Sequence, residues 1–171
     1  MEYGVFILVQ ICFAIYLVYY IIAFLSGAPY VPSTNPTSDS MIRLARLSSR
    51  KRAYDLGSGD GKLLPRIAAT GAHAIGIEIN PLLVLFSTIR SWLSPYRNSI
   101  SVRWGSFWAT TFADADVVFV YLLPLRMEKL EKKLAKECKK GTIVVSNSFL
   151  FPHWKILRQD TVNHVYVYKI A

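Results

Sequence analysis

The chain has 171 residues, which is enough for one domain and a short appendage. Its two cysteines, Cys12 and Cys138, are far apart and in no metal-like spacing, so we expect neither a disulfide framework nor a bound metal. The formal net charge of +9 is compatible with acidic partners, but the sequence contains no nucleic-acid-binding module and we expect no nucleic-acid partner.

The first predicted element is a long apolar helix. No Asp, Glu, Lys or Arg occurs from Tyr3 to Ser38, and the apolar core runs from about Tyr3 to Leu25. A helix of this length crosses a hydrocarbon layer of about 30 Å. A cleaved signal peptide would need a positively charged start and a shorter apolar stretch. The sequence therefore predicts a transmembrane helix over residues 1–26, with the lipid bilayer as its partner.

Basic residues follow this helix and indicate its orientation. Flanks that stay in the cytoplasm carry an excess of Lys and Arg. We therefore expect the rest of the chain on the cytoplasmic side of a membrane, or on the matrix side in a mitochondrion. The basic residues could also contact anionic lipid head groups, or simply form a solvated helix face. They are Arg43, Arg46, Arg50, Lys51 and Arg52.

A proline-rich linker is expected over residues 27–36, between this helix and a domain at 37–171. Prolines in the linker cannot continue a helix and favour extended or turn geometry. The stretch 29–33 places a tyrosine and a serine among these prolines. It is either a stiff spacer or a segment that folds back over a ligand.

The domain alternates predicted strands and helices, as a parallel α/β sheet requires. The helix expected at 81–93 is apolar nearly all round, so we expect it to be well buried. These patterns predict a Rossmann-like α/β fold with helices on both faces of the sheet and an antiparallel strand at the end of the chain. The expected strands are 52–56, 73–78, 100–104, 115–121, 142–146 and two within 155–170. One expected helix is capped by Thr37 or Ser38 and runs to about Ser49, and the others cover 62–69, 81–93 and 126–140.

The first predicted strand leads into a glycine-rich turn in which three glycines stand at alternate positions. Glycine lets a ligand approach the backbone because it has no Cβ. The dinucleotide fingerprint fails because its third glycine would stand at Lys62, and the P-loop fails because Leu63 stands where Ser or Thr must hold magnesium. The turn matches the D-x-G-x-G-x-G loop of class I S-adenosylmethionine (SAM) methyltransferases; an ordinary glycine turn without a ligand is the alternative. The residues assigned to the ligand are Asp55, Gly57, Ser58, Gly59 and Gly61.

An acidic residue follows at the end of the second predicted strand. Glu78 lies 17 residues after Gly61, and ligands of doubly wound sheets bind outside the carboxyl ends of the strands. A carboxylate there can accept both hydroxyls of a ribose. Asn80 and Pro81 supply an N-cap and a first-turn proline for the next helix, so Glu78 is not needed for capping. We assign both Glu78 and Asn80 to the ligand.

The next strand ends supply further candidates. Ser106 could meet an adenine ring, and Phe107 or Trp108 could stack on it or simply pack in the core. Tyr121 ends the fourth predicted strand, where methyltransferases of this class place the acceptor. Asn147 follows the fifth strand. We predict that Tyr121 and Asn147 orient the acceptor.

The combination of motifs resembles the membrane-anchored protein-lysine methyltransferases that act on the adenine nucleotide translocase and on the c subunit of ATP synthase. That resemblance implies the seven-strand sheet of class I enzymes, SAM as cofactor and a lysine of a membrane-associated protein as acceptor. It rests on the N-terminal apolar segment, Pro29–Pro32, Tyr54–Gly61, Gly76–Pro81, the run Leu130–Leu134 and Phe151–Trp154.

Several points stay open at this level. Many relatives have an acidic residue where Ser106 stands, which weakens the adenine assignment. His153 and Trp154 could border the substrate entrance or form a structural turn. The acceptor could instead be a lipid or a quinone-type molecule, or the protein could bind SAM without catalysis. Neither the target nor the oligomeric state follows from the sequence.

Overall fold

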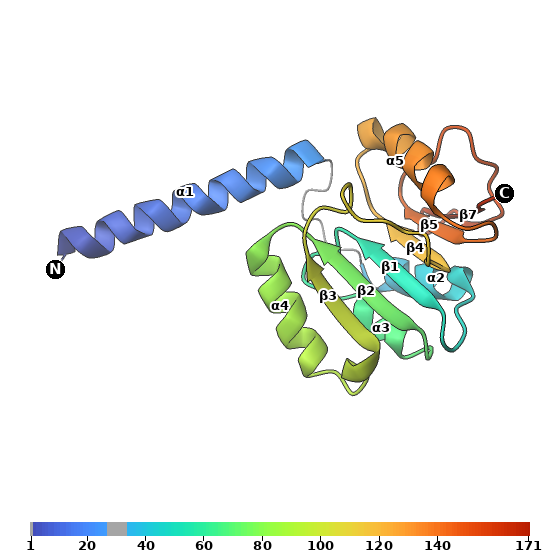
Figure 1. The fold of residues 1–171 in the computed structure, drawn as a ribbon, viewed down its shortest axis with the longest axis horizontal. Coiled ribbons are helices and arrows are strands. Elements are labelled where there is room, and N and C mark those ends of the chain that lie inside the picture. Colours follow the sequence, from blue (N-terminus) through green and yellow to red (C-terminus); the bar gives the residue numbers. More distant parts are fainter. Residues whose placement is uncertain (1, 27–33) are drawn as a thin grey trace.

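The computed structural model describes residues 2–26 and 34–171. The first of these ranges is one helix, α1 (Glu2–Ser26), which extends away from the domain (Figure 1). Among the side chains of α1 that the structure describes, the large apolar ones are exposed. Within the two described ranges, no helix combines the length and the apolar character needed to cross a membrane. The predicted contact of residues 29–33 with a ligand lies outside the described residues.

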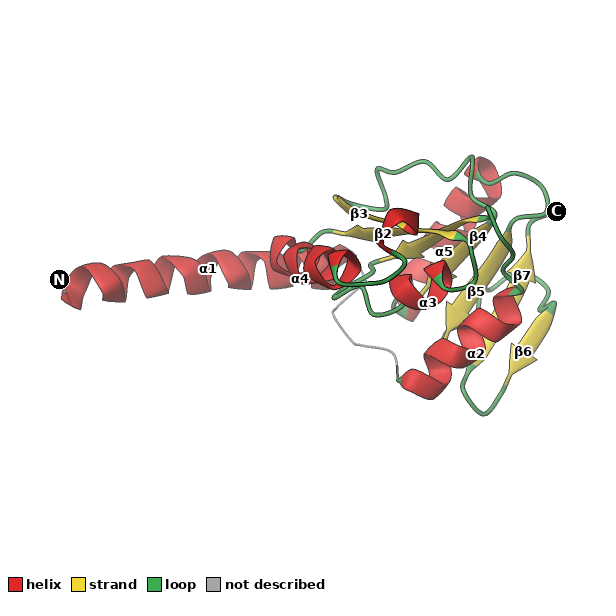
Figure 2. Cartoon of the chain, turned by 90° about the horizontal axis from the view of Figure 1, so that it is seen from below, coloured by secondary structure: helices red, strands yellow, loops and turns green. Residues whose placement is uncertain are grey.

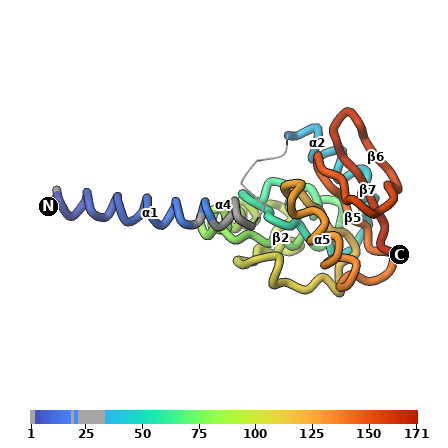
Figure 3. The backbone as a smooth tube through the Cα atoms, turned by 90° about the horizontal axis from the view of Figure 1, so that it is seen from above, coloured from blue at the N-terminus to red at the C-terminus, as the bar shows by residue number. Residues whose placement is uncertain are grey.

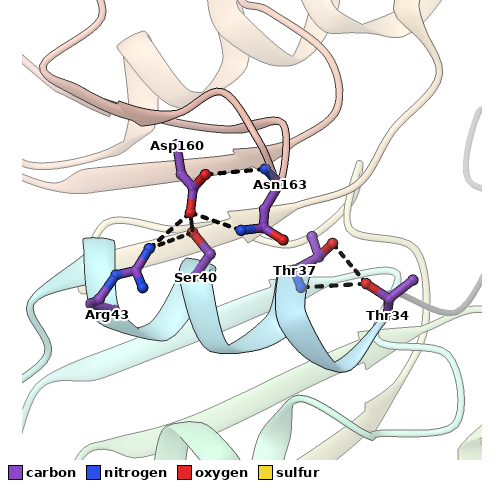
Figure 4. Close-up of polar contacts among 6 residues, drawn as sticks. All are labelled: Thr34, Thr37, Ser40, Arg43, Asp160 and Asn163. Atoms are coloured by element: carbon purple, nitrogen blue, oxygen red, sulfur yellow. Dashed lines mark hydrogen bonds and ion pairs between the residues drawn. The ribbon is translucent and has the colours of Figure 1, made fainter.

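The helix α2 (Asn35–Ala45) begins earlier than the sequence indicated. Its N-cap is Thr34, whose side chain accepts a hydrogen bond from the backbone N–H of Thr37 at 3.3 Å (Figure 4). The prediction of Thr37 or Ser38 as the cap was therefore wrong. Pro36 fits in the first turn, because the backbone N–H that proline lacks would have no hydrogen-bond partner within the helix at that position.

The sheet contains seven strands in the order β3-β2-β1-β4-β5-β7-β6, which confirms the predicted mixed sheet. Strand β7 runs antiparallel to both β5 and β6, whereas the pairs among β1 to β5 are parallel. The order reverses between β1 and β4, and ligands of open α/β sheets bind at such a switch point. The strands are β1 (Arg52–Leu56), β2 (His73–Glu78), β3 (Ile100–Trp104), β4 (Val117–Val120), β5 (Ile143–Asn147), β6 (Arg158–Asp160) and β7 (Val165–Lys169).

Helices cover both faces of this sheet, as predicted. On one face lie α2 and α3 (Leu64–Ala68) (Figure 2). Met41 of α2 and Ile67 of α3 pack there in one buried cluster. On the other face, Leu130 and Leu134 of α5 (Pro124–Glu137) belong to a second cluster, which includes Tyr54 of β1.

A carboxylate ties α2 to the far edge of the sheet. Asp160 of β6 accepts hydrogen bonds from Ser40 Oγ at 2.6 Å, from Arg43 Nη2 at 2.8 Å and from Asn163 (Figure 4). These bonds lower the pKa of Asp160, with the Ser40 hydroxyl as the largest cause. Arg43 is thus ion-paired inside the domain. The same holds for Lys51 and Arg52, whose partners are Asp116 and Asp114. These ion pairs favour a structural role for Arg43, Lys51 and Arg52.

The helix α4 (Pro81–Trp92) overturns one expectation. It was expected to be well buried, but its only buried residues are Ser87 and Ser91. Its apolar residues, such as Phe86 and Trp92, are 58% and 68% exposed. The physical reason is that α4 approaches the glycine-rich turn and the sheet through its small serine side. The apolar side has no element packed over it among the described residues.

Candidate functional site

The glycine-rich turn after β1 has the backbone conformation that its sequence predicts. Gly57, Gly59 and Gly61 have φ angles of 72°, 56° and 74°, in the region that favours glycine. The backbone N–H groups of Gly57 and Ser58 both donate to the carbonyl oxygen of Ile77, at 2.9 and 3.0 Å. The turn is therefore fastened to β2 and holds a defined shape at the switch point of the sheet.

Two glycines make room for close packing around this turn. A Cβ on Gly61 would lie 2.1 Å from Ser87 Oγ of α4, and a Cβ on Gly76 would lie 2.7 Å from Ser58 Oγ. The need for glycine at position 76 was not recognised from the sequence. The signal was present, because glycine inside an isoleucine-rich strand often marks close approach of another backbone. The turn is therefore closely packed between β2 and α4.

Glu78 holds the turn from the end of β2. Its Oε2 accepts from the backbone N–H of Gly59 at 2.9 Å, and its Oε1 accepts from those of Ile79 and Asn80 at 2.9 and 2.8 Å. Burial raises the pKa of Glu78, while these three hydrogen bonds oppose the rise. A carboxylate has about four acceptor positions. One position on Oε2 therefore remains for a ligand hydroxyl, so Glu78 has room for one ribose hydroxyl rather than for both, because the backbone takes the other positions.

Asn80 caps α4, as predicted. Its Oδ1 accepts from the backbone N–H groups of Leu82 and Leu83, at 3.0 and 3.4 Å. Pro81 is the first residue of the helix. The side chain of Asn80 therefore caps the helix, and its backbone N–H donates to Glu78. The contact of Asn80 with a ligand stays a prediction.

Acidic groups gather beside the turn. Burial raises the pKa of Asp55 to about 7, and the nearby charges of Glu78 and Asp60 contribute to the rise. Asp60 also forms an ion pair with Arg90 of α4 at 2.9 Å. Crowded carboxyl groups hold protons more tightly because each negative charge disfavours the next. The site is consequently suited to a ligand that carries positive charge.

The end of β3 supplies a partly buried polar group and a buried ring. Ser106 Oγ accepts from the backbone N–H of Trp108 at 3.2 Å. Phe107 is 5% exposed and belongs to the hydrophobic cluster on the α5 face, with its ring centroid 4.9 Å from that of Trp108. The structure thus places Phe107 in the core, which was the second of its two predicted roles. Its contact with a ligand stays a prediction.

Tyr121 and Asn147 come together at the ends of neighbouring strands. Val120 of β4 pairs with Ser146 of β5, so Tyr121 and Asn147 are the next residues on the two strands. The Tyr121 ring stacks on Phe149 at 6.3 Å between centroids. Asn147 is buried and accepts from Ser148 Oγ at 2.8 Å. An aromatic surface and an amide thus lie at the same edge of the sheet as the turn.

The segment Phe151–Trp154 is fastened to α5 by an acid that sequence reasoning missed. Glu131 accepts from the backbone N–H of His153 at 3.1 Å and contacts His153 Nδ1 at 2.9 Å. Trp154 packs on Phe151 and Tyr168. Glu131 is buried next to the inward-facing Leu130, and an acid at such a helix position is the signal that could have identified it. These contacts favour a structural turn.

Comparisons with known proteins agree with this arrangement. The family model for the ANTKMT methyltransferase domain matches residues 55–158, starting at the acidic residue before the turn. The lysine N-methyltransferase of Mus musculus that is named for the c subunit of ATP synthase is 36% identical over 126 residues, covering 74% of this chain and 51% of the relative. A protein-lysine N-methyltransferase of Saccharolobus islandicus is 31% identical over 157 residues, covering 87% and 98%. The chain thus spans about half the length of the mouse relative and nearly all of the archaeal one.

A solved structure shares the fold as well as the sequence. It is that of an RNA methyltransferase from Salinibacter ruber in complex with S-adenosyl-L-homocysteine. The TM-score is 0.79 at 35% identity, and the match covers 82% of this chain and 94% of that one.

Proposed function

The chain belongs to the ANTKMT methyltransferase domain family, and on that premise we propose that it is a SAM-dependent methyltransferase acting on lysine side chains of a protein. The observation that carries the proposal is the turn after β1, held by Glu78 at the switch point of the sheet. The similarity to lysine methyltransferases over most of the chain supports lysine as the acceptor.

The residues present fit SAM. The three left-handed glycines leave the backbone open to the amino-acid and ribose parts of the cofactor. The buried Ser58 Oγ has no hydrogen-bond partner among the described residues. SAM carries a sulfonium and an ammonium group, and both suit the acidic environment of Asp55 and Glu78. The free acceptor position of Glu78 suits a ribose hydroxyl, and Ser106 is assigned to the adenine side.

When bound, SAM would supply an electrophilic methyl group: a neutral lysine amine would attack its carbon, the C–N bond forming as the C–S bond breaks and S-adenosylhomocysteine leaves with the electron pair of that bond. The chain's own task is to bring the amine into line and to keep it neutral. Apolar aromatic surroundings lower the pKa of a lysine ammonium, so that its proton passes to solvent before the attack. Tyr121 and Phe149 supply such a surface. We assign the task of orienting the amine to the hydroxyl of Tyr121 and the amide of Asn147, which follow neighbouring strands.

The test is transfer of label from SAM carrying a radioactive methyl group to membranes of the source cell. The expected product is a labelled protein band that resists lipid extraction and ribonuclease, with methyl-lysine found by mass spectrometry. Label extracted with the lipids would support a lipid or quinone-type acceptor. Label released by ribonuclease would support RNA, the class to which the name of the Salinibacter protein points. SAM binding without transfer would support a non-catalytic role.

We further propose that residues 1–26 hold the domain at a membrane, on its cytoplasmic or matrix side. The supporting observations are the absence of charge from Tyr3 to Ser38 and the exposed apolar side chains of α1. Such side chains gain free energy when they leave water. The full chain should stay with membranes through an alkaline carbonate wash. Added protease should digest the domain in inside-out vesicles and spare it in right-side-out vesicles; release by the wash would contradict the proposal.

A further inference from the structure

The helix α4 has its polar and apolar sides in the reverse of the usual arrangement. A surface helix of a soluble protein turns its apolar stripe toward the core. In α4 the buried residues are serines, and the apolar residues are exposed. Exposed apolar patches of this kind mark surfaces that bind a partner. The exposed set is Leu82, Leu85, Phe86, Ile89, Trp92 and Leu93, and Trp104 of β3 and Tyr96 extend it; we call these eight residues the α4 face.

The α4 face also has the charge and the aromatic content of a membrane-contacting surface. From Ile79 to Ala113 the chain contains no Asp or Glu. It contains Arg97 and Arg103, and also Arg90, whose charge is already paired with Asp60. Arginines near a bilayer are attracted to anionic head groups. Trp and Tyr concentrate where lipid meets water, because their rings are apolar with one polar atom. An apolar helix with aromatic and basic residues is typical of helices that lie in the bilayer interface.

The position of the α4 face agrees with this interpretation. Figures 1 to 3 show α4 on the side of the domain from which α1 extends. A domain held by α1 would therefore turn α4 toward the membrane. A groove runs beside α4 on the same side and adds apolar surface from Pro65, Phe86, Ile89 and Leu93. The ion pair of Asp60 and Arg90 also lines this groove. Arg43, Lys51 and Arg52 are less suited to this contact, because each forms an ion pair within the domain.

We propose that the α4 face rests on the surface of a bilayer that contains anionic lipids, and that this contact orients the domain. The inference rests on the proposed attachment of the chain to a membrane. Because Ser87 of α4 packs against Gly61, and Asn80 at its start bonds to Glu78, the contact would place the site beside the bilayer surface. Acceptors that lie at the surface of the membrane would then be within reach.

Tryptophan fluorescence of the full chain tests the contact directly. All four tryptophans lie in the domain and none in α1. Trp92 and Trp104 are 68% and 65% exposed, whereas Trp108 and Trp154 are partly buried against the core. Full-length protein is reconstituted in vesicles of phosphatidylcholine and phosphatidylglycerol, with or without bromine on the acyl chains. We expect brominated lipid to quench part of the emission, and the double variant W92F/W104F to lose most of that quenching.

Charge variants and a matched control complete the experiment. Phe86→Glu and Leu93→Glu should weaken the quenching without lowering the melting temperature, because both side chains are exposed. Val162→Glu makes the same kind of change at an 85% exposed position in the turn between β6 and β7 and should leave the quenching unchanged. Sedimentation of the protein with the vesicles measures its attachment to the membrane, independently of the contact made by the α4 face.

Each other result overturns the inference. If the protein sediments with the vesicles but shows no quenching, it is attached to the membrane but the α4 face does not contact the lipid. Quenching that survives in W92F/W104F would place the contact elsewhere. Protein that does not sediment would refute the attachment and the contact together. A dimer in detergent that Phe86→Glu converts to a monomer, with no quenching in vesicles, would assign the α4 face to a second copy of the chain.

Discussion

Changing Glu78 to Gln separates the structural role of this carboxylate from its predicted role with SAM. The amide can keep its oxygen toward the N–H groups of Ile79 and Asn80. Its nitrogen must then face the N–H of Gly59, where the carboxylate oxygen accepts at 2.9 Å. Two donors would meet in a buried place, so the Gly59 N–H would lose its partner.

The expected cost has two parts. Losing one hydrogen bond to a charged group and leaving a donor unpaired costs about 1–3 kcal/mol of unfolding free energy. In a domain of this size that lowers the melting temperature by about 3–10 °C. If the remaining acceptor position of Glu78 binds a ribose hydroxyl, SAM affinity should fall by a further tenfold or more, since each tenfold corresponds to about 1.4 kcal/mol.

The assays are thermal unfolding without ligand and calorimetric titration with SAM. Asp160→Asn is the matched control, because it makes the same acid-to-amide change in a carboxylate with several hydrogen bonds at the far edge of the sheet. It should lower the melting temperature and leave SAM affinity unchanged. If Glu78→Gln bound SAM as tightly as the parent protein does, the assignment of the ribose to Glu78 would be refuted.

Three further predictions concern the same edge of the sheet. The pKa of Asp55 is 3.8 when unfolded and about 7 when folded, so stability without ligand should fall as pH rises through this interval. Asp55→Asn should remove this slope and melt higher than the parent at pH ~8, while pH-melting curves of equal slope would contradict the shift. Gly61→Ala should destabilise the protein through its clash with Ser87 and its positive φ, and adding Ser87→Gly should recover part of the melting temperature; recovery would fail if the clash were not the cause. Tyr121→Phe should lower kcat for the lysine substrate with SAM affinity unchanged in a titration, and an unaltered kcat would exclude the hydroxyl from orienting the amine.

Much of the sheet could be predicted because its signals are local. The first three strands have the predicted bounds, since short apolar runs between turn residues specify them. The α5 boundary was less accurate: the helix starts at Pro124 and ends at Glu137, where 126–140 had been expected. Helix ends depend on capping and on neighbouring packing, which residue preferences describe only in part.

The glycine-rich turn, the acid at the end of β2 and the cap at Asn80 could all be predicted from local sequence, because each depends on residues close in the chain. The folded structure was needed to show how the oxygens of Glu78 accept from three N–H groups and how Glu131 holds His153. It also decided that α4 turns its serines inward. An apolar pattern in a helix indicates that its apolar side chains are favoured away from water, but it does not indicate what those side chains will pack against. That depends on what the rest of the fold brings alongside, and in α4 the close approach of Gly61 selects the serine side.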